Sequence, residues 1–302
     1  MQTRKVERVA ADGWRLRATV VEPDLPARAL IVAGHAMMVD ARTLWRPGRP
    51  SLVGTLAAAG FRVLVADLRG HGESGPRADE GGNWSYDALV ADTALWLEWG
   101  RELAGGLPLL WLSHSLFGHT SLAFFGQSPH LQPRAFAALA VNAWNRQFEP
   151  SRAQWLAKSL IMRSSRWVAE RAGKLPARQL RMGNNDEALD YWRDLTRMAA
   201  THWQARDGTD YLAGLANVKA PILCVFSDGD RLFTRPADGM RFTSHLPGRT
   251  ALVLGPRVGV PALRGIVPGH MGLVTDPRAE PLWQHVADWF GAQCGDGSGA
   301  SR

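Results

Sequence analysis

The apolar residues of this chain occur mostly in short uninterrupted runs, a pattern typical of strands that are buried on both faces. The runs before residue 146 read ALIVAGHA, FRVLVADLRG, LPLLWLSHS and AFAALAVNA. Segments with helical spacing of apolar positions lie between these runs, among them residues 51–59 and 87–103. Strands that alternate with helices predict right-handed strand–helix–strand units and a mostly parallel sheet with helices on both faces.

Residues 5–23 follow a different pattern, in which apolar and polar positions alternate on either side of Asp12-Gly13. Alternation indicates strands with one buried face, and Asp-Gly is typical of a tight hairpin turn. The chain is therefore expected to open with an antiparallel hairpin and to continue with parallel strands. Together the two patterns predict an α/β fold built on a mixed, mostly parallel sheet.

Residues 146–210 interrupt the alternation of strands and helices. The segment is rich in arginine and tryptophan, its apolar positions have helical spacing, and it contains no continuous apolar run. Two further runs, APILCVFSDGD and TALVLGP, and an amphipathic helix from Glu280 follow it. We therefore expect an α/β core of residues 1–145 and 211–292, a helical insertion between its two parts, and a disordered tail over 293–302.

Composition narrows the classes of function. The 302 residues, 46% of them hydrophobic, suffice for a large core, but no apolar stretch is long enough to span a membrane. A cytoplasmic protein without stable membrane insertion is therefore expected. The net charge of +7 comes mainly from arginines that are scattered singly, so nucleic acid is not an expected partner. Cys224 and Cys294 are expected to be unpaired thiols.

Three polar residues stand where a parallel sheet usually carries its reactive groups, in loops at the carboxyl ends of strands. Ser115 lies in SHSLFGH, at the bend between an apolar run and a helical segment. Asp230 lies in SDGD directly after the strand ILCVF, and His270 lies in PGHMG before the last helix. A serine, a histidine and a carboxylate are the groups that nucleophilic acyl transfer needs.

The order Ser115, Asp230, His270, together with VLVADLRGHGES over residues 63–74, resembles the α/β-hydrolase superfamily. The resemblance covers almost the whole chain, and the sequence is most similar to lysophospholipase-like and serine aminopeptidase-like branches of the bacterial serine hydrolases. It implies an eight-stranded sheet on which residues 146–210 form a lid. It also implies that the three residues form a catalytic triad, which needs neither a metal nor an organic cofactor.

In such a triad Ser115 attacks the substrate carbonyl, His270 takes and returns the proton, and Asp230 orients the histidine. Asp228 is the alternative acid, because both carboxylates belong to the same turn. Asp-Gly-Asp is also common turn chemistry, so a turn without a catalytic role is a further interpretation.

The histidines near these motifs are expected to be structural. His114 alternates to the other side of the strand from the nucleophile, and His71 belongs to a loop that the superfamily uses structurally. A metal set of His35, Asp40 and His71 lacks the spacing of known zinc motifs. No metal site is therefore expected.

The oxyanion that forms during acyl transfer needs two backbone donors. The helix after the nucleophile supplies the N–H of Leu116, and the resemblance implies the N–H of Met37 as the second donor, with Ala36 as the alternative. The side chains of Ala36, Met38 and Trp144 are expected to contact the substrate. Because the insertion is dense in tryptophan, an apolar acyl or aromatic group is the expected ligand.

One position departs from the superfamily's pattern around the nucleophile. The pattern G-x-S-x-G becomes S-x-S-x-F, because Phe117 stands where a glycine is usual and Gly118 follows one position late. We expect Gly118 to give the helix its room and the ring of Phe117 to pack beside the turn without covering Ser115. A ring over the hydroxyl would instead favour a non-catalytic binding protein.

These residues predict a hydrolase that cleaves a carboxylic ester through an acyl-enzyme on Ser115, because an alcohol leaves more easily than an amine. A thioester or an amide is the alternative substrate, and an acyltransferase would use the same residues with another acceptor in place of water. The expected partner is a small and apolar acyl substrate. The sequence predicts neither the natural substrate nor the oligomeric state.

Overall fold

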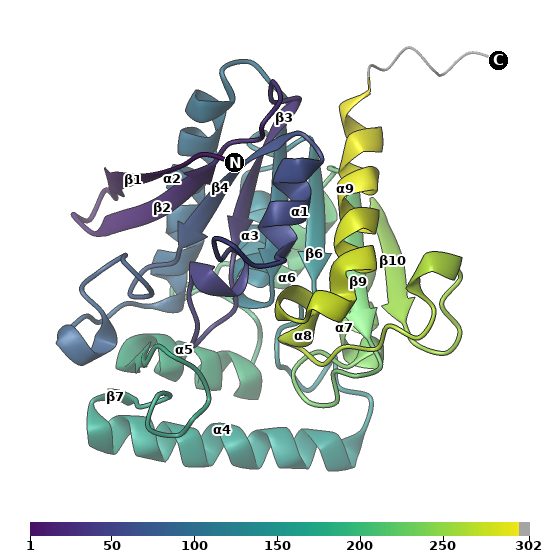
Figure 1. The fold of residues 1–302 in the computed structure, drawn as a ribbon. Coiled ribbons are helices and arrows are strands. Elements are labelled where there is room, and N and C mark those ends of the chain that lie inside the picture. Colours follow the sequence, from purple (N-terminus) through teal and green to yellow (C-terminus); the bar gives the residue numbers. More distant parts are fainter. Residues whose placement is uncertain (296–302) are drawn as a thin grey trace.

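An eight-stranded sheet forms the centre of the computed structural model, which describes residues 1–295 of the chain (Figure 1). Its strands are β1 (Thr3–Val9), β2 (Arg15–Val21), β3 (Ala29–Gly34), β4 (Phe61–Asp67), β5 (Leu109–His114), β6 (Ala135–Leu139), β9 (Ile222–Ser227) and β10 (Arg249–Leu254). They lie in the order β1-β2-β4-β3-β5-β6-β9-β10. β2 is antiparallel to both of its neighbours, and all other neighbours are parallel. The predicted mixed, mostly parallel α/β sheet is therefore confirmed.

The uninterrupted apolar runs correspond to the strands in the middle of the sheet. Every residue of β3, β5, β6 and β9 is buried. Successive side chains of a strand point to opposite faces, so each of these strands contributes to two cores. In β3, Leu30 and Val32 pack into the core on one face, whereas Ile31 and Ala33 pack into the core on the other.

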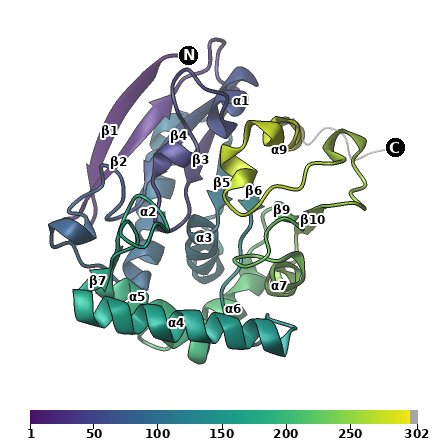
Figure 2. The ribbon, with the colours of Figure 1, turned by 60° about the horizontal axis from the view of Figure 1, so that its bottom comes forward.

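Two pairs of helices cover the two faces of the sheet (Figure 2). They are α2 (Tyr86–Ala104) with α3 (Leu116–Gln127) on the first core, and α1 (Leu52–Ala58) with α9 (Glu280–Cys294) on the second. Local capping sets where two of these helices begin, because an N-cap hydroxyl satisfies a free backbone N–H of the first turn. Ser51 accepts the N–H of Gly54 at the start of α1, and Ser85 accepts that of Ala88 at the start of α2.

We call residues 146–210 the cap. They contain helices α4 (Arg152–Ala172) and α5 (Leu189–Ala200), which lie beyond the carboxyl ends of the central strands (Figures 1 and 2). The predicted helical insertion thus has helices, but it also contains the two-residue strands β7 (Lys174–Leu175) and β8 (Glu187–Ala188), which pair with each other. Strands this short leave no apolar run in the sequence. That the cap acts as a lid stays a prediction.

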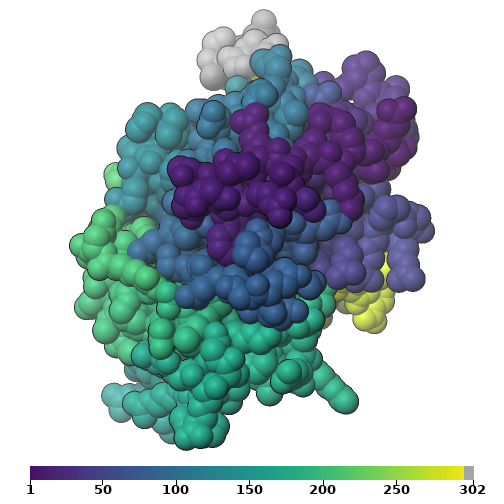
Figure 3. Space-filling view, turned by 90° about the vertical axis from the view of Figure 1, so that its left-hand side faces the viewer, coloured from purple at the N-terminus to yellow at the C-terminus, as the bar shows by residue number. Residues whose placement is uncertain are grey.

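The hairpin of β1 and β2 lies at the molecular surface, and the loop after β4 lies between it and the cap (Figure 3). No helix within residues 1–295 is long and apolar enough to cross a membrane. Both cysteines are free thiols, as predicted. The tail was predicted to begin at residue 293, whereas α9 continues to Cys294, where the Arg134 side chain donates to the carbonyl oxygen of Gln293. Residues 296–302 of the predicted tail lie outside the described residues.

Candidate active site

Ser115 lies at the turn between β5 and α3 with a strained backbone, at φ 53° and ψ −109°. A positive φ is costly for a residue with a side chain and persists only where the surroundings hold it. Here the N–H of Ser115 donates to the carbonyl oxygen of Leu139 at 3.0 Å. The Ser115 side chain borders an apolar cavity. This geometry is that of a nucleophile elbow, in which a sharp strand-to-helix turn presents the hydroxyl above the sheet.

The ring of Phe117 packs away from that cavity. It stacks on Trp111 of β5 with 5.2 Å between ring centroids, and a β-carbon on Gly34 of β3 would lie 2.2 Å from it. Gly34 therefore provides the room that a glycine at position 117 would otherwise provide. A β-carbon on Gly118 would also lie 2.2 Å from a neighbouring side chain. The predicted packing of Phe117 is confirmed, because Ser115 borders the cavity and Phe117 does not.

Asp230 and His270 are joined by a hydrogen bond of 2.6 Å between Oδ2 and Nδ1. Asp230 is buried after β9, and its carboxylate also accepts three backbone N–H groups of the following turn, at 3.4, 3.0 and 2.9 Å. These bonds fix the carboxylate so that the histidine carries a proton on Nδ1 and leaves Nε2 as the acceptor. Asp228 instead packs against Gly255, where a β-carbon would lie 2.1 Å from its Oδ2. The geometry favours Asp230 over Asp228 as the partner of His270.

The ring of His270 packs against the rings of His114 and Phe233, with 4.9 Å between centroids in each pair. Nε2–H of His114 donates to the carbonyl oxygen of His270 at 3.0 Å, which is the structural role predicted for His114. Burial and the neighbouring His270 lower the pKa of His114 well below 6.5, so it is neutral. Within the described residues no hydrogen bond joins Ser115 to His270, although His114 directly precedes Ser115 and contacts His270.

The two backbone N–H groups predicted to form the oxyanion hole form no hydrogen bond with the described residues. Neither the N–H of Leu116 nor that of Met37 donates to any atom of residues 1–295. Leu116 is the first residue of α3, where the helix dipole adds positive potential. Two backbone donors are what a developing oxyanion requires.

The cap binds both backbone polar groups of Met38, in the loop that also carries Met37. Glu187 of β8 accepts the N–H of Met38 at 2.5 Å. The N–H groups of Asn184 and Asn185 donate to the carbonyl oxygen of Met38 at 2.9 and 3.0 Å. The backbone of Met38 has a φ of 62°, which is strained for a residue with a side chain. The cap therefore stabilises the conformation that leaves the N–H of Met37 free.

Glu187 also pairs with His71, with 3.0 Å between Oε1 and Nε2 and both side chains fully buried. Burial by itself lowers the pKa of His71, but the carboxylate of Glu187 outweighs it and the net pKa lies above 6.5. Sequence reasoning placed His71 in a structural role correctly and missed Glu187. A histidine with a raised pKa stabilises the fold below its unfolded pKa, and this contribution is lost as pH rises through the folded pKa.

We expect Glu187→Gln to destabilise the protein most in mildly acidic buffer. The amide still accepts the N–H of Met38, but the charge that keeps His71 protonated is gone. The free energy of unfolding is therefore expected to fall by about 2 kcal/mol at about pH 6. The loss becomes smaller in alkaline buffer, where His71 is neutral in both proteins. Thermal unfolding across pH measures it, with the exposed Glu98→Gln on α2 as the control. A loss that does not vary with pH would show that His71 is not charged in the fold.

An apolar cavity of about 100 Å³ lies against Ser115. Met37, Met38 and Trp144 border it, and the contact of Met38 and Trp144 with the substrate stays a prediction. Ala36 does not border it, because Ala36 is buried in the core and its carbonyl oxygen accepts Nδ1–H of the preceding residue. The prediction for Ala36 as a substrate contact is therefore corrected. The cap contributes Ile161, Met162, Met182, Trp192, Leu195 and Met198 to the wall.

Tyr86 and His119 also border the cavity, and sequence reasoning singled out neither. Helical spacing gives a signal for His119, because residues four apart lie on one face of a helix and Ser115 immediately precedes α3. Tyr86 has no local signal, since it opens α2 in an unrelated part of the chain. Among residues 1–295 no group of three His, Cys, Asp or Glu side chains is arranged to hold a metal ion.

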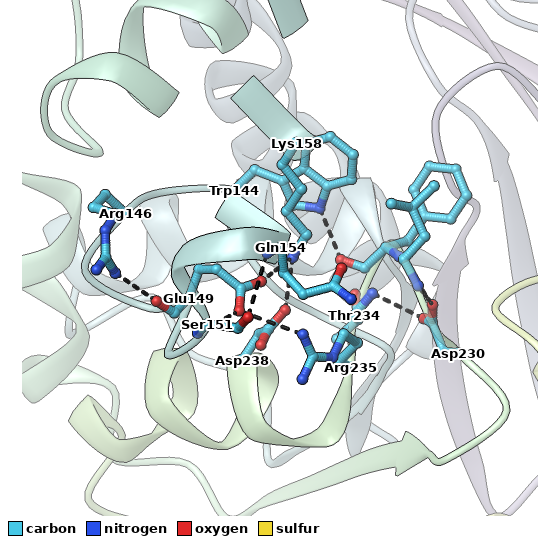
Figure 4. A network of polar contacts seen from close by, with 12 residues as sticks. Trp144, Arg146, Glu149, Ser151, Gln154, Lys158, Asp230, Thr234, Arg235 and Asp238 are labelled. Atoms are coloured by element: carbon cyan, nitrogen blue, oxygen red, sulfur yellow. Dashed lines mark hydrogen bonds and ion pairs between the residues drawn. The ribbon is translucent and has the colours of Figure 1, made fainter. Parts of the chain in front are cut away.

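A buried ion cluster joins the cap to the segment that follows Asp230 (Figure 4). Lys158 of α4 is 1% exposed, and its Nζ lies 2.9 Å from Oε2 of Glu149 and 2.6 Å from Oδ2 of Asp238. Asp238 belongs to α7 (Pro236–Phe242), directly after the Asp230 turn. A buried ammonium is stable only beside its counter-charges, so the cluster fixes α4 relative to α7.

Comparison with protein families gives one match. Residues 48–254 match the model of the family described as serine aminopeptidase, S33. The matched range includes Ser115 and Asp230 and ends before His270. A search of curated proteins found no match to the chain.

Solved structures are similar over nearly the whole chain. The esterase domain of a Rhodothermus marinus protein has a TM-score of 0.56 at 16% identity, over 98% of this chain and 100% of that one. A thermophilic esterase from Thermogutta terrifontis has the same TM-score, identity and coverage. Est1E from Butyrivibrio proteoclasticus has a TM-score of 0.60 at 13% identity, over 96% of this chain and 98% of that one. At these identities the likeness establishes a shared fold.

Proposed function

Because the chain belongs to the serine aminopeptidase S33 family of the α/β-hydrolase superfamily, we propose that it hydrolyses a carboxylic ester through an acyl-enzyme on Ser115. One observation carries this proposal. Asp230 holds His270 by a 2.6 Å hydrogen bond, and His270 packs on His114, the residue before the strained turn at Ser115. A carboxylate, a histidine and a serine in this relation have the roles of an acyl-transfer triad.

The reaction has two steps. As Oγ of Ser115 attacks the carbonyl carbon, its proton passes to Nε2 of His270, and Asp230 stabilises the imidazolium. The oxyanion accepts the N–H groups of Leu116 and Met37, and its collapse expels the alcohol, which takes the proton from His270. Water then attacks the acyl-enzyme while His270 takes its proton, and the collapse of this intermediate releases the acid as His270 returns the proton to Oγ of Ser115.

The cavity supports a short apolar acyl group as the part that binds beside Ser115. Its volume of about 100 Å³ is smaller than the ~150 Å³ of an engineered cavity that holds benzene. A long acyl chain would therefore require the cap to move. An ester is favoured over an amide because an alkoxide is the better leaving group and needs less help from His270. The solved esterases with the same fold agree with this preference.

Labelling with a fluorophosphonate tests the nucleophile directly. The reagent is expected to modify Ser115, with the adduct located by mass spectrometry, and Ser115→Ala is expected to remain unlabelled. Ser128→Ala, at the other end of α3, is the matched control and retains labelling. A well-folded protein that the reagent does not modify would exclude Ser115 as an activated nucleophile.

A further inference from the structure

His119 is the fourth residue after Ser115 and borders the same cavity. Residues four apart lie on one helix face and about 6 Å apart along the helix axis. His119 is 3% exposed, and most of the cavity wall around it consists of apolar side chains. Its imidazole is thus one of the few polar groups available to an acyl chain bound to Ser115.

A chain of hydrogen bonds determines which nitrogen of His119 carries the proton. The indole N–H of Trp203 can only donate, and it donates to the hydroxyl oxygen of Tyr86 at 2.9 Å. The only acceptor for the hydroxyl proton of the fully buried Tyr86 within the described residues is Nδ1 of His119, at 2.8 Å. A buried hydroxyl without an acceptor is costly, so Tyr86 donates to Nδ1, and the proton of His119 resides on Nε2.

This Nε2–H has no acceptor in the protein, since no described residue forms a hydrogen bond with Nε2 of His119. Burial lowers the pKa of His119 to about 3, so the ring is neutral near pH 7 and Nδ1 carries no proton. Asn142, which also borders the cavity, has a buried Oδ1 without a partner. The cavity wall therefore contains polar groups that the protein itself leaves unsatisfied.

We propose that His119 is a specificity-determining residue that selects acyl groups with a hydrogen-bond-accepting oxygen about one helical turn from the ester carbonyl. This selection rests on the proposed acyl-enzyme at Ser115. The substrate class is a short ester whose acyl group is apolar apart from one keto or ether oxygen. A wholly apolar acyl group leaves the donor of His119 unpaired, whereas the oxygen satisfies it, a difference of about fivefold to tenfold in kcat/KM.

The first experiment compares para-nitrophenyl esters in which a keto group replaces one methylene at successive positions of a short acyl chain. Each rate is divided by the hydroxide-catalysed rate of the same ester, which removes the electronic effect of the keto group. The wild-type protein is expected to prefer one keto position by about fivefold to tenfold over the plain ester. The absence of any position-dependent preference in the wild-type protein overturns the role of His119 without recourse to a variant.

Variants then attribute the preference to the N–H group. His119→Leu, which has no donor, is expected to lose the preference, and His119→Gln, which retains an N–H, is expected to keep part of it. Tyr86→Phe removes the hydroxyl that fixes the tautomer and is expected to weaken the preference. A preference that survives in His119→Leu would assign the selection to another group and overturn the role of His119.

A binding experiment separates this selection from the catalytic proposal. Ser115→Ala is titrated with the methyl esters of the preferred keto acid and of its plain analogue, using the fluorescence of the tryptophans that border the cavity. Tighter binding of the keto ester by about fivefold to tenfold supports selection by His119 even if the wild-type protein hydrolyses neither ester. Equal binding in a protein that hydrolyses both overturns the selection and leaves the proposed hydrolase intact.

Discussion

Ser115→Ala is expected to lower kcat for a short-chain ester by about 10⁵-fold, the largest effect of any single substitution considered for this chain. The substitution removes the atom that forms the acyl-enzyme, while the backbone donors at Leu116 and Met37 and the apolar cavity remain. These remaining groups keep the rate of hydrolysis above that of the uncatalysed reaction in water. A spectrophotometric ester assay measures the loss, and a thermal unfolding temperature close to that of the wild type shows that the fold is retained.

Two aspartates of one turn provide the matched comparison. Asp230→Asn is expected to lower kcat by about 10⁴-fold, because an amide beside Nδ1 favours the wrong tautomer of His270. Asp228→Asn is expected to retain a rate close to that of the wild type, since Asp228 packs against Gly255 and the carboxylate bonded to His270 is that of Asp230. Equal losses in the two variants would contradict the pairing of Asp230 with His270.

The second large effect concerns stability. Lys158→Met is expected to lower the free energy of unfolding by about 3–5 kcal/mol, because it leaves the buried carboxylate of Asp238 without its counter-charge and leaves Glu149 with Arg235 alone. The same substitution releases α4 from α7, so it is also expected to lower ester hydrolysis. Urea unfolding at equilibrium measures the loss. Arg163→Met, at an exposed position of α4, removes one positive charge from the same helix and is expected to have little effect.

The loss of folding stability in Lys158→Met is also expected to depend on pH. Burial alone would raise the pKa of Glu149, but Lys158 outweighs it and the net pKa is below 4.5. Its stabilisation is therefore present above the unfolded pKa and is lost as pH falls through the folded pKa. Burial already holds the pKa of Asp238 above 3.8 beside Lys158. Without Lys158 the pKa of both carboxyl groups rises, and the variant loses stability as pH rises. The difference between the two proteins is thus largest near neutral pH, and a difference that grows in acid would contradict the ion cluster.

Much of the fold was predictable because its signals are local. A run of consecutive apolar residues indicates a strand buried on both faces whatever the rest of the chain does, and β3, β5, β6 and β9 all follow such runs. The candidate residues were predictable for a related reason. Ser115, Asp230 and His270 each lie in a loop near the carboxyl end of a strand, and parallel strands bring these ends to one edge of the sheet.

The contacts that support the site were not predictable from the same signals. Glu187 pairs with His71 across 116 positions of the chain, and Lys158 pairs with Asp238 across 80. No periodicity reports such pairs, because they depend on how the cap docks on the sheet. The tautomer of His119 likewise depends on two residues of distant segments, Tyr86 and Trp203.

Phe117 shows most clearly which features the sequence determines and which features only the tertiary structure determines. The sequence by itself determined that a serine stands at a strand-to-helix turn and that the glycine usual two positions later is absent. Whether the phenylalanine obstructs the turn was decided only by the tertiary structure, in which β3 brings Gly34 against the ring. The physical reason is that local patterns set which element a residue forms, whereas the space around its side chain is set by strands that become neighbours only when the sheet assembles.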